Sequence, residues 1–133
     1  MEMLRKTRAE INLDCIEHNL SAFRGTLAKE VKVAGVVKAN AYGHDIVTVT
    51  GLLLEEEADY IAVATVQEAA LLRRNFPHAP LLVMGYTPDD QLPFTVDQGI
   101  TQTVFSLKQC QLLSQRALAT KKKAKVHIKV DTE

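Results

Sequence analysis

One lysine stands where an amine could act as a nucleophile. Lys38 ends the run 31–38, whose nearly continuous apolar character is typical of a parallel strand covered on both faces. Burial disfavours the charged form of an amine, and a neutral lysine can condense with an aldehyde to form a Schiff base. The alternative is a lysine that ends a strand and extends its charge into solvent. Position alone favours this alternative.

A second row of polar side chains lies in residues 125–131. An apolar set alternates there with a polar set, and the two point to opposite faces of a strand: Val126, Ile128 and Val130 against Lys125, His127, Lys129 and Asp131. In a barrel strand we expect the apolar set to pack on helices and the polar set to face the interior. Interior charges are costly unless they are paired or engaged by a ligand. An edge strand with one solvated face is the alternative.

Composition and motifs argue against several classes of protein. Lys plus Arg number 16 and Asp plus Glu number 16, so the basic excess typical of nucleic-acid binders is absent. No apolar run approaches the roughly 20 residues of a membrane span, and residues 1–6 lack the apolar core of a secretory signal. The four histidines and two cysteines, Cys15 and Cys110, do not form a metal-binding pattern. We therefore expect a cytoplasmic protein with reduced thiols and no metal.

The elements that must position these residues alternate between strands and helices. Strands are predicted at 31–38, 60–64, 80–85, 100–105 and 125–131. A capping box begins three of the predicted helices, at Asp14 with Glu17, Thr65 with Glu68, and Ser106 with Gln109. Another helix runs through 46–53, and the segment around Pro88 and Pro93 is irregular with a short helix. The predicted buried side of the last helix is formed by Leu112, Leu113 and Leu118.

Such alternation predicts parallel α/β structure with right-handed crossovers. An open doubly wound sheet and a barrel both fit it. No Gly-x-Gly-x-x-Gly turn or phosphate-binding Gly-x-x-x-x-Gly-Lys loop is present. A complete eight-unit barrel needs about 250 residues, so a barrel of about five strands would be incomplete. Its active site would lie at the carboxyl ends of the strands, where Lys38 is expected.

One long segment resembles a known family. Residues 36–44, Val-Val-Lys-Ala-Asn-Ala-Tyr-Gly-His, resemble the pyridoxal-phosphate signature of bacterial alanine racemases. Residues 9–14 with 18–20, 58–65 with 68–69, and 127–132 resemble other stretches of that family in the expected order. The resemblance covers essentially the whole chain, and about the first third of a typical member.

The resemblance implies a fold and an activity. The fold is the N-terminal part, residues 1–133, of a pyridoxal-phosphate-binding (β/α)8 barrel of the TIM type. In the family a β-rich C-terminal domain, absent here, follows this barrel, and the enzyme is a homodimer. The activity is an isomerase reaction, the interconversion of L- and D-alanine, which feeds peptidoglycan synthesis.

The resemblance also implies roles for four residues. Lys38 matches the lysine that forms the Schiff base with pyridoxal phosphate and acts as the base on the D-alanine side. Tyr42 matches a tyrosine that contacts the cofactor phosphate, and Val36 a residue that lines the cofactor. Lys129 matches a lysine that is often carbamylated and orients a substrate-binding arginine.

Several parts of the family's site have no counterpart in this sequence. None of Tyr42, Tyr60 and Tyr86 matches the tyrosine that opposes the lysine, and Glu133 stands where the family has glycine. We therefore expect the 133 residues alone not to racemise alanine at a useful rate. The alternatives are a serine/alanine racemase of the same fold type and a non-catalytic part-barrel that binds pyridoxal phosphate.

Overall fold

The computed structural model describes residues 7–132 and divides the chain into two compact units, Met1–Val31 and Lys32–Glu133. The first unit contains α1 (Leu13–Arg24). Its N-cap is Asn12, whose side chain accepts the Cys15 N–H at 3.1 Å. The predicted cap, Asp14, is therefore wrong: it lies in the first turn, where a carboxylate still suits the positive end of the helix dipole. No residue of α1 is buried.

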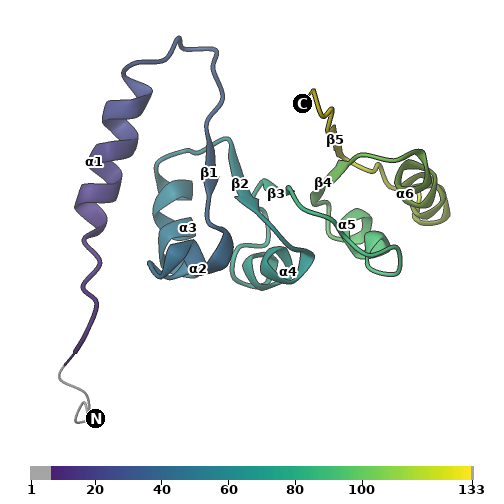
Figure 1. Cartoon of the computed structure of the whole chain (residues 1–133), viewed down its shortest axis with the longest axis horizontal. Helices are drawn as coiled ribbons and strands as arrows, with labels where there is room; N and C mark the ends of the chain where they lie inside the picture. The colour runs from purple at the N-terminus through teal and green to yellow at the C-terminus, as the bar shows by residue number, and fades with distance from the viewer. Residues whose placement is uncertain (1–6, 133) are drawn as a thin grey trace. The chain divides into compact units, whose positions relative to one another are not determined.

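The second unit is built on one five-stranded parallel sheet (Figure 1). Its strands are β1 (Ala34–Val36), β2 (Tyr60–Val63), β3 (Leu81–Val83), β4 (Thr101–Val104) and β5 (Val126–Ile128). They pair in sequence order, β1-β2-β3-β4-β5. A doubly wound sheet reverses its strand order at a switch point, whereas barrel strands follow one another. The order therefore selects the part-barrel from the two predicted architectures.

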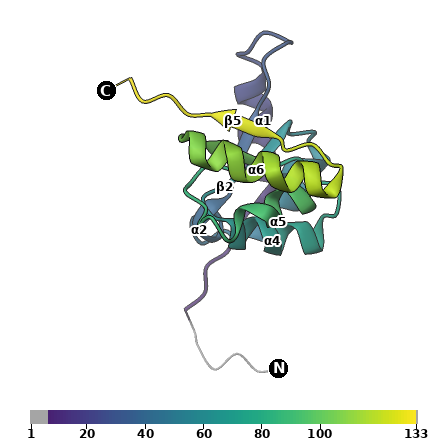
Figure 2. The ribbon, with the colours of Figure 1, turned by 90° about the vertical axis from the view of Figure 1, so that its right-hand side faces the viewer.

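Helices connect the strands and lie along one side of the sheet (Figures 1 and 2). They are α3 (Ile46–Glu55), α4 (Val66–Asn75), α5 (Leu92–Asp97) and α6 (Leu107–Thr120). The core between sheet and helices is apolar, and its largest fully buried side chains include Ile61, Leu72, Leu81, Leu92, Ile100 and Leu113. This burial holds the strand ends in fixed positions.

Two of the predicted capping boxes can be compared at the level of single bonds. At α4 the box is complete, with Thr65 and Glu68 each accepting the other's backbone N–H. At α6, Ser106 accepts the Gln109 N–H at 3.3 Å. The Gln109 side chain, however, accepts the N–H of Phe105 rather than that of Ser106, so this second box is only half formed.

Two predictions about apolar faces are wrong. Leu118, expected on the buried side of α6, is 78% exposed, while Leu113 is buried. Val126, Ile128 and Val130 were expected to pack on helices, yet all three are exposed. Within residues 7–132, the last helix, α6, precedes β5, so no described helix follows β5 to cover its outer face.

Candidate active site at the carboxyl edge of the sheet

Lys38 lies two residues beyond the carboxyl end of β1, which is Val36. A Cβ built at Gly35 would meet Leu53 of α3, so Gly35 faces the helices and its neighbour Val36 faces the opposite, inner side. Val37 is fully buried, and Lys38 is half-buried. Within the described part of the chain, the Lys38 amine makes no hydrogen bond or ion pair. It is available to an incoming electrophile.

A left-handed turn follows Lys38 directly. The segment α2 (Lys38–Tyr42) contains four consecutive residues with φ between 50° and 54°, Ala39 to Tyr42, and none of them is glycine. L-residues in this conformation cost about 1–2 kcal/mol each, so the surrounding structure must hold them there. The turn ends at Gly43, whose φ of 92° suits glycine.

Hydrogen bonds on both sides hold this turn. The Ala41 N–H donates to Val37 O at 2.9 Å, and His44 Nδ1 lies 3.0 Å from Ala41 O. The Asn40 side chain accepts the Ile46 N–H at 2.9 Å and so connects the turn to the start of α3. The neighbouring cap, Asp45, accepts the Thr48 N–H, and this bond lowers the pKa of the Asp45 carboxyl below its ordinary value.

The remaining predicted residues lie at the same edge of the sheet but are not all joined. Tyr42 is 67% exposed on the turn. Lys129, just beyond β5, lines a cavity of about 320 Å³ with Phe105 and Asp131. Among residues 7–132, no hydrogen bond, ion pair or ring contact joins Lys129 to Lys38 or Tyr42. The structure thus brings Lys38 and Tyr42 together on one turn and leaves Lys129 across the sheet.

The polar row of β5 faces the inner side of the sheet. Ala34 pairs in register with Tyr60, and both share the inner face with Val36. The Tyr60 ring contacts the His127 ring edge-on, with centroids 5.6 Å apart. This contact confirms the interior orientation predicted for His127, and Lys129 lies two residues further along the same row.

Sequence reasoning missed three residues at this edge. Tyr86 and Phe105, in the segments that follow β3 and β4, are exposed aromatic residues whose ring centroids lie 6.2 Å apart. Glu68 was predicted only as a capping residue, yet its second oxygen accepts the Ala39 N–H at 2.7 Å. No sequence pattern signals a bond between residues 29 positions apart.

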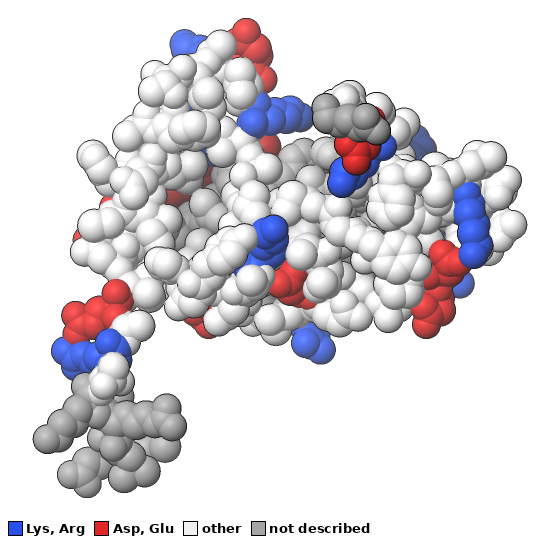
Figure 3. Space-filling view, viewed as in Figure 1, with Lys and Arg blue, Asp and Glu red and all other residues white. Residues whose placement is uncertain are grey.

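Neither the distribution of charged side chains nor the metal-binding residue types indicate a second candidate site among the described residues. On the face drawn in Figure 3, basic and acidic side chains are scattered, with no broad patch of one sign. Among the described residues, no group of three or more His, Cys, Asp or Glu could hold a metal ion. In the same residues, no helix is long and apolar enough to span a bilayer.

Comparison with known families decides the relationship. Residues 11–133 match the family described as alanine racemase, N-terminal domain. The chain belongs to this family. The alanine racemase 2 of Caldanaerobacter subterraneus subsp. tengcongensis is 47% identical over 129 residues, which are 97% of this chain and 33% of that protein. The alanine racemase of Helicobacter pylori strain P12 is 39% identical over 128 residues, 96% of this chain and 34% of that protein.

Solved alanine racemases share the fold as well. The alanine racemase of Clostridium difficile 630, determined in complex with cycloserine, superposes with a TM-score of 0.92 at 41% identity. The match covers 99% of this chain and 35% of that one. The chain therefore spans about a third of the length of the alanine racemases it matches. The prediction of an N-terminal portion of the alanine racemase barrel is confirmed.

Proposed function

We propose that this chain is the N-terminal part of a pyridoxal-phosphate-dependent alanine racemase, in which Lys38 forms the Schiff base. One observation carries the proposal: a half-buried lysine, whose amine has no partner among the described residues, stands near the carboxyl end of the first barrel strand, inside the family signature. The hydrogen-bonded turn that follows Lys38 supports it, because a nucleophile must be held in the right direction as well as be accessible.

The side chains fit pyridoxal phosphate in their chemistry. Lys38 supplies an amine that can condense with the aldehyde, with loss of one water molecule. Tyr42 supplies an exposed hydroxyl for the phosphate, and Val36 an exposed apolar side chain for the ring. When bound, the cofactor supplies an electron sink for the charge that develops at the substrate Cα. We expect Lys129 to act as a carbamate that orients a substrate-binding group.

Racemisation needs proton transfer on both faces of the substrate Cα. The Lys38 amine takes and returns the proton on one face. The group on the other face comes from residues outside this chain, in keeping with a chain that spans a third of its relatives. We propose that the whole protein is a cytoplasmic homodimer whose D-alanine enters peptidoglycan synthesis.

The activity is testable in a chimera. The matching N-terminal third of the Caldanaerobacter alanine racemase 2 is replaced by this chain, and D-alanine formed from L-alanine is measured. We expect racemisation with the chimera and none with its Lys38→Ala form. Serine is assayed in parallel as a second substrate. A folded chimera that converts neither amino acid contradicts the proposal.

Schiff-base formation is tested on the 133-residue chain itself. The chain is incubated with pyridoxal phosphate and reduced with borohydride, and the modified lysine is located by mass spectrometry. We expect the adduct on Lys38 and its loss in Lys38→Ala. Lys32→Ala, which removes an exposed lysine from the same run, is the matched control and keeps the adduct. Equal labelling of both variants would contradict a specific role for Lys38.

A further inference from the structure

One carboxylate connects the ends of two neighbouring strands at the candidate site. Glu68 is the third residue of α4, and its side chain folds back over the start of that helix. One oxygen accepts the N–H groups of Ala64 and Thr65, at 2.9 and 3.1 Å, at the exit of β2. The other oxygen accepts the Ala39 N–H at 2.7 Å, at the exit of β1. An ordinary capping box uses only the N-cap N–H, so the bond to Ala39 goes beyond helix capping.

The Ala39 bond acts on the peptide unit that carries Lys38. Ala39 is the first residue of the left-handed turn, and its N–H belongs to the peptide that joins it to Lys38. Ala39 begins a series of four strained residues, so the direction in which the chain leaves Lys38 depends on contacts outside the turn. Hydrogen bonds to a charged acceptor are among the stronger ones available to a protein.

We infer that Glu68 is a positioning residue for Lys38: its carboxylate fixes the Lys38–Ala39 peptide and thereby the direction of the reactive amine. This inference rests on the proposed function for its chemical meaning. To hold both strand exits at once, each of the two carboxyl oxygens of Glu68 must accept a hydrogen bond. A glutamine has one acceptor and one donor, so it can serve only one of the two strand exits.

The matched variants are Glu68→Gln and Thr65→Ala. Glu68→Gln keeps the size of the side chain and removes one acceptor. Thr65→Ala removes the hydroxyl that accepts the Glu68 N–H at 3.2 Å, and it leaves the carboxylate with its backbone donors. Both variants weaken the start of α4, but only Glu68→Gln acts on the Ala39 bond. Its single acceptor oxygen is expected to stay with the two N–H groups of Ala64 and Thr65 and to leave the one N–H of Ala39 without an acceptor.

Two measurements on the 133-residue chain test the inference. Amide hydrogen exchange at Ala39 reports the bond without any cofactor, and we expect Glu68→Gln to accelerate it about tenfold or more. The orientation of the Lys38 amine is measured in two ways. One is the rate at which the borohydride-trapped adduct forms at Lys38, and the other is the visible absorbance band before trapping. We expect Glu68→Gln to slow trapping and shift the band, and Thr65→Ala to change both much less.

The outcomes separate the inference from the proposed function. Equal effects of the two variants, or unchanged Ala39 exchange in Glu68→Gln, would overturn the positioning role and leave Lys38 as the Schiff-base residue. Absence of any Lys38 adduct in the unsubstituted chain would contradict the proposed function. In that case the Ala39 exchange rates still decide whether Glu68 holds this peptide.

Discussion

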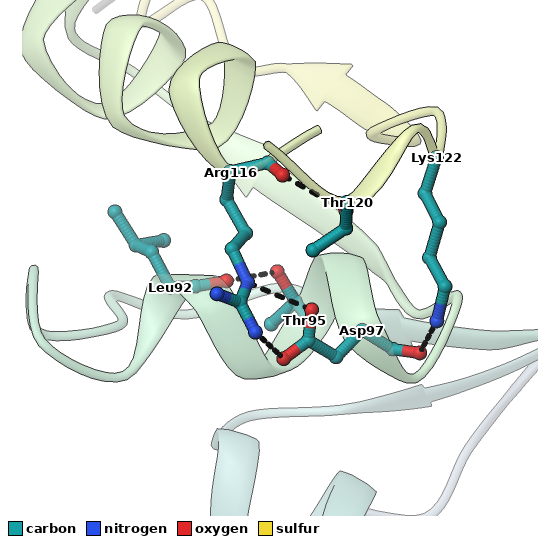
Figure 4. Close-up of polar contacts among 6 residues, drawn as sticks. All are labelled: Leu92, Thr95, Asp97, Arg116, Thr120 and Lys122. Carbon is teal, nitrogen blue, oxygen red and sulfur yellow. Dashed lines mark hydrogen bonds and ion pairs between the residues drawn. The ribbon is translucent and has the colours of Figure 1, made fainter. Parts of the chain in front are cut away.

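At the scale of single residues, Asp97, the last residue of α5, connects that helix to α6 and to the segment that follows α6 (Figure 4). Its carboxylate accepts two hydrogen bonds from Arg116 of α6, at 2.8 and 2.5 Å. Its backbone carbonyl accepts a bond from Lys122 Nζ at 2.7 Å. Lys122 belongs to a run of three lysines whose charge suits a helix C-terminus, and this bond gives it a partner in α5 as well.

This pair predicts a pH dependence of stability. The hydrogen bonds from Arg116 hold the pKa of Asp97 below its ordinary 3.8. A carboxyl whose folded pKa is depressed contributes stability above its unfolded pKa and loses that contribution as the pH falls through the folded pKa. We expect Asp97→Asn to lower the thermal unfolding midpoint at about pH 7, and the difference from the unsubstituted chain to shrink below about pH 4.

The control for this experiment is Asp90→Asn, since Asp90 is exposed and forms none of the ion pairs of the described chain. Its midpoint should follow that of the unsubstituted chain at every pH. If the difference in unfolding midpoint between Asp97→Asn and the unsubstituted chain stays constant from neutral to acid pH, the Asp97 carboxylate is not what stabilises the fold.

At the scale of elements, sequence patterns located every strand and missed most of the detail at the site. Thr65 and Glu68 predicted the start of α4 because capping depends on neighbours three residues apart. No sequence pattern predicts the left-handed turn at Ala39–Tyr42, because alanine has no local preference for that conformation. Its geometry depends on long-range bonds such as that from Ala39 to Glu68, which local patterns do not encode.

Substitution by alanine is expected to have opposite effects on stability at two glycines, Gly85 and Gly51. A Cβ at Gly85 would lie 2.3 Å from Ala64 O, a backbone atom of the neighbouring strand exit, whereas one at Gly51 would lie 3.8 Å from the Phe76 ring. We expect Gly85→Ala to lower the free energy of unfolding by roughly 1–3 kcal/mol through overpacking. Gly51→Ala, inside α3, should raise it by about 0.5–1 kcal/mol.

Urea unfolding of both variants measures these changes through the transition midpoint. The two glycines serve as controls for each other, because each receives the same methyl group. Equal shifts in the same direction would contradict the close approach of the β2 and β3 exits.

At the scale of the whole second unit, the sheet has two open edges, at β1 and β5. Unpaired strand edges expose N–H and C=O groups that can pair with another chain. At β5 the edge is also apolar, because Ile128 is 78% exposed and Val130 is exposed nearby. We therefore expect the 133-residue chain to self-associate through β5.

This association is tested by sedimentation over a range of concentrations. Ile128→Lys should reduce association, because a charge on an edge strand opposes pairing, and it should change stability little at so exposed a position. Leu118→Lys is the matched control, since Leu118 is equally exposed but lies on α6. A monodisperse monomer, or an equal effect of both substitutions, would contradict association through the edge.

The turn after Lys38 has a stereochemical consequence. Positive φ values near 50° are the mirror image of the ordinary helical conformation, and they are the natural preference of an amino acid of the opposite hand. The L-alanines at positions 39 and 41 thus adopt the backbone geometry that D-alanine would adopt without strain. The backbone next to Lys38 therefore has, at two L-alanines, the handedness preferred by D-alanine, the enantiomer that is the proposed product.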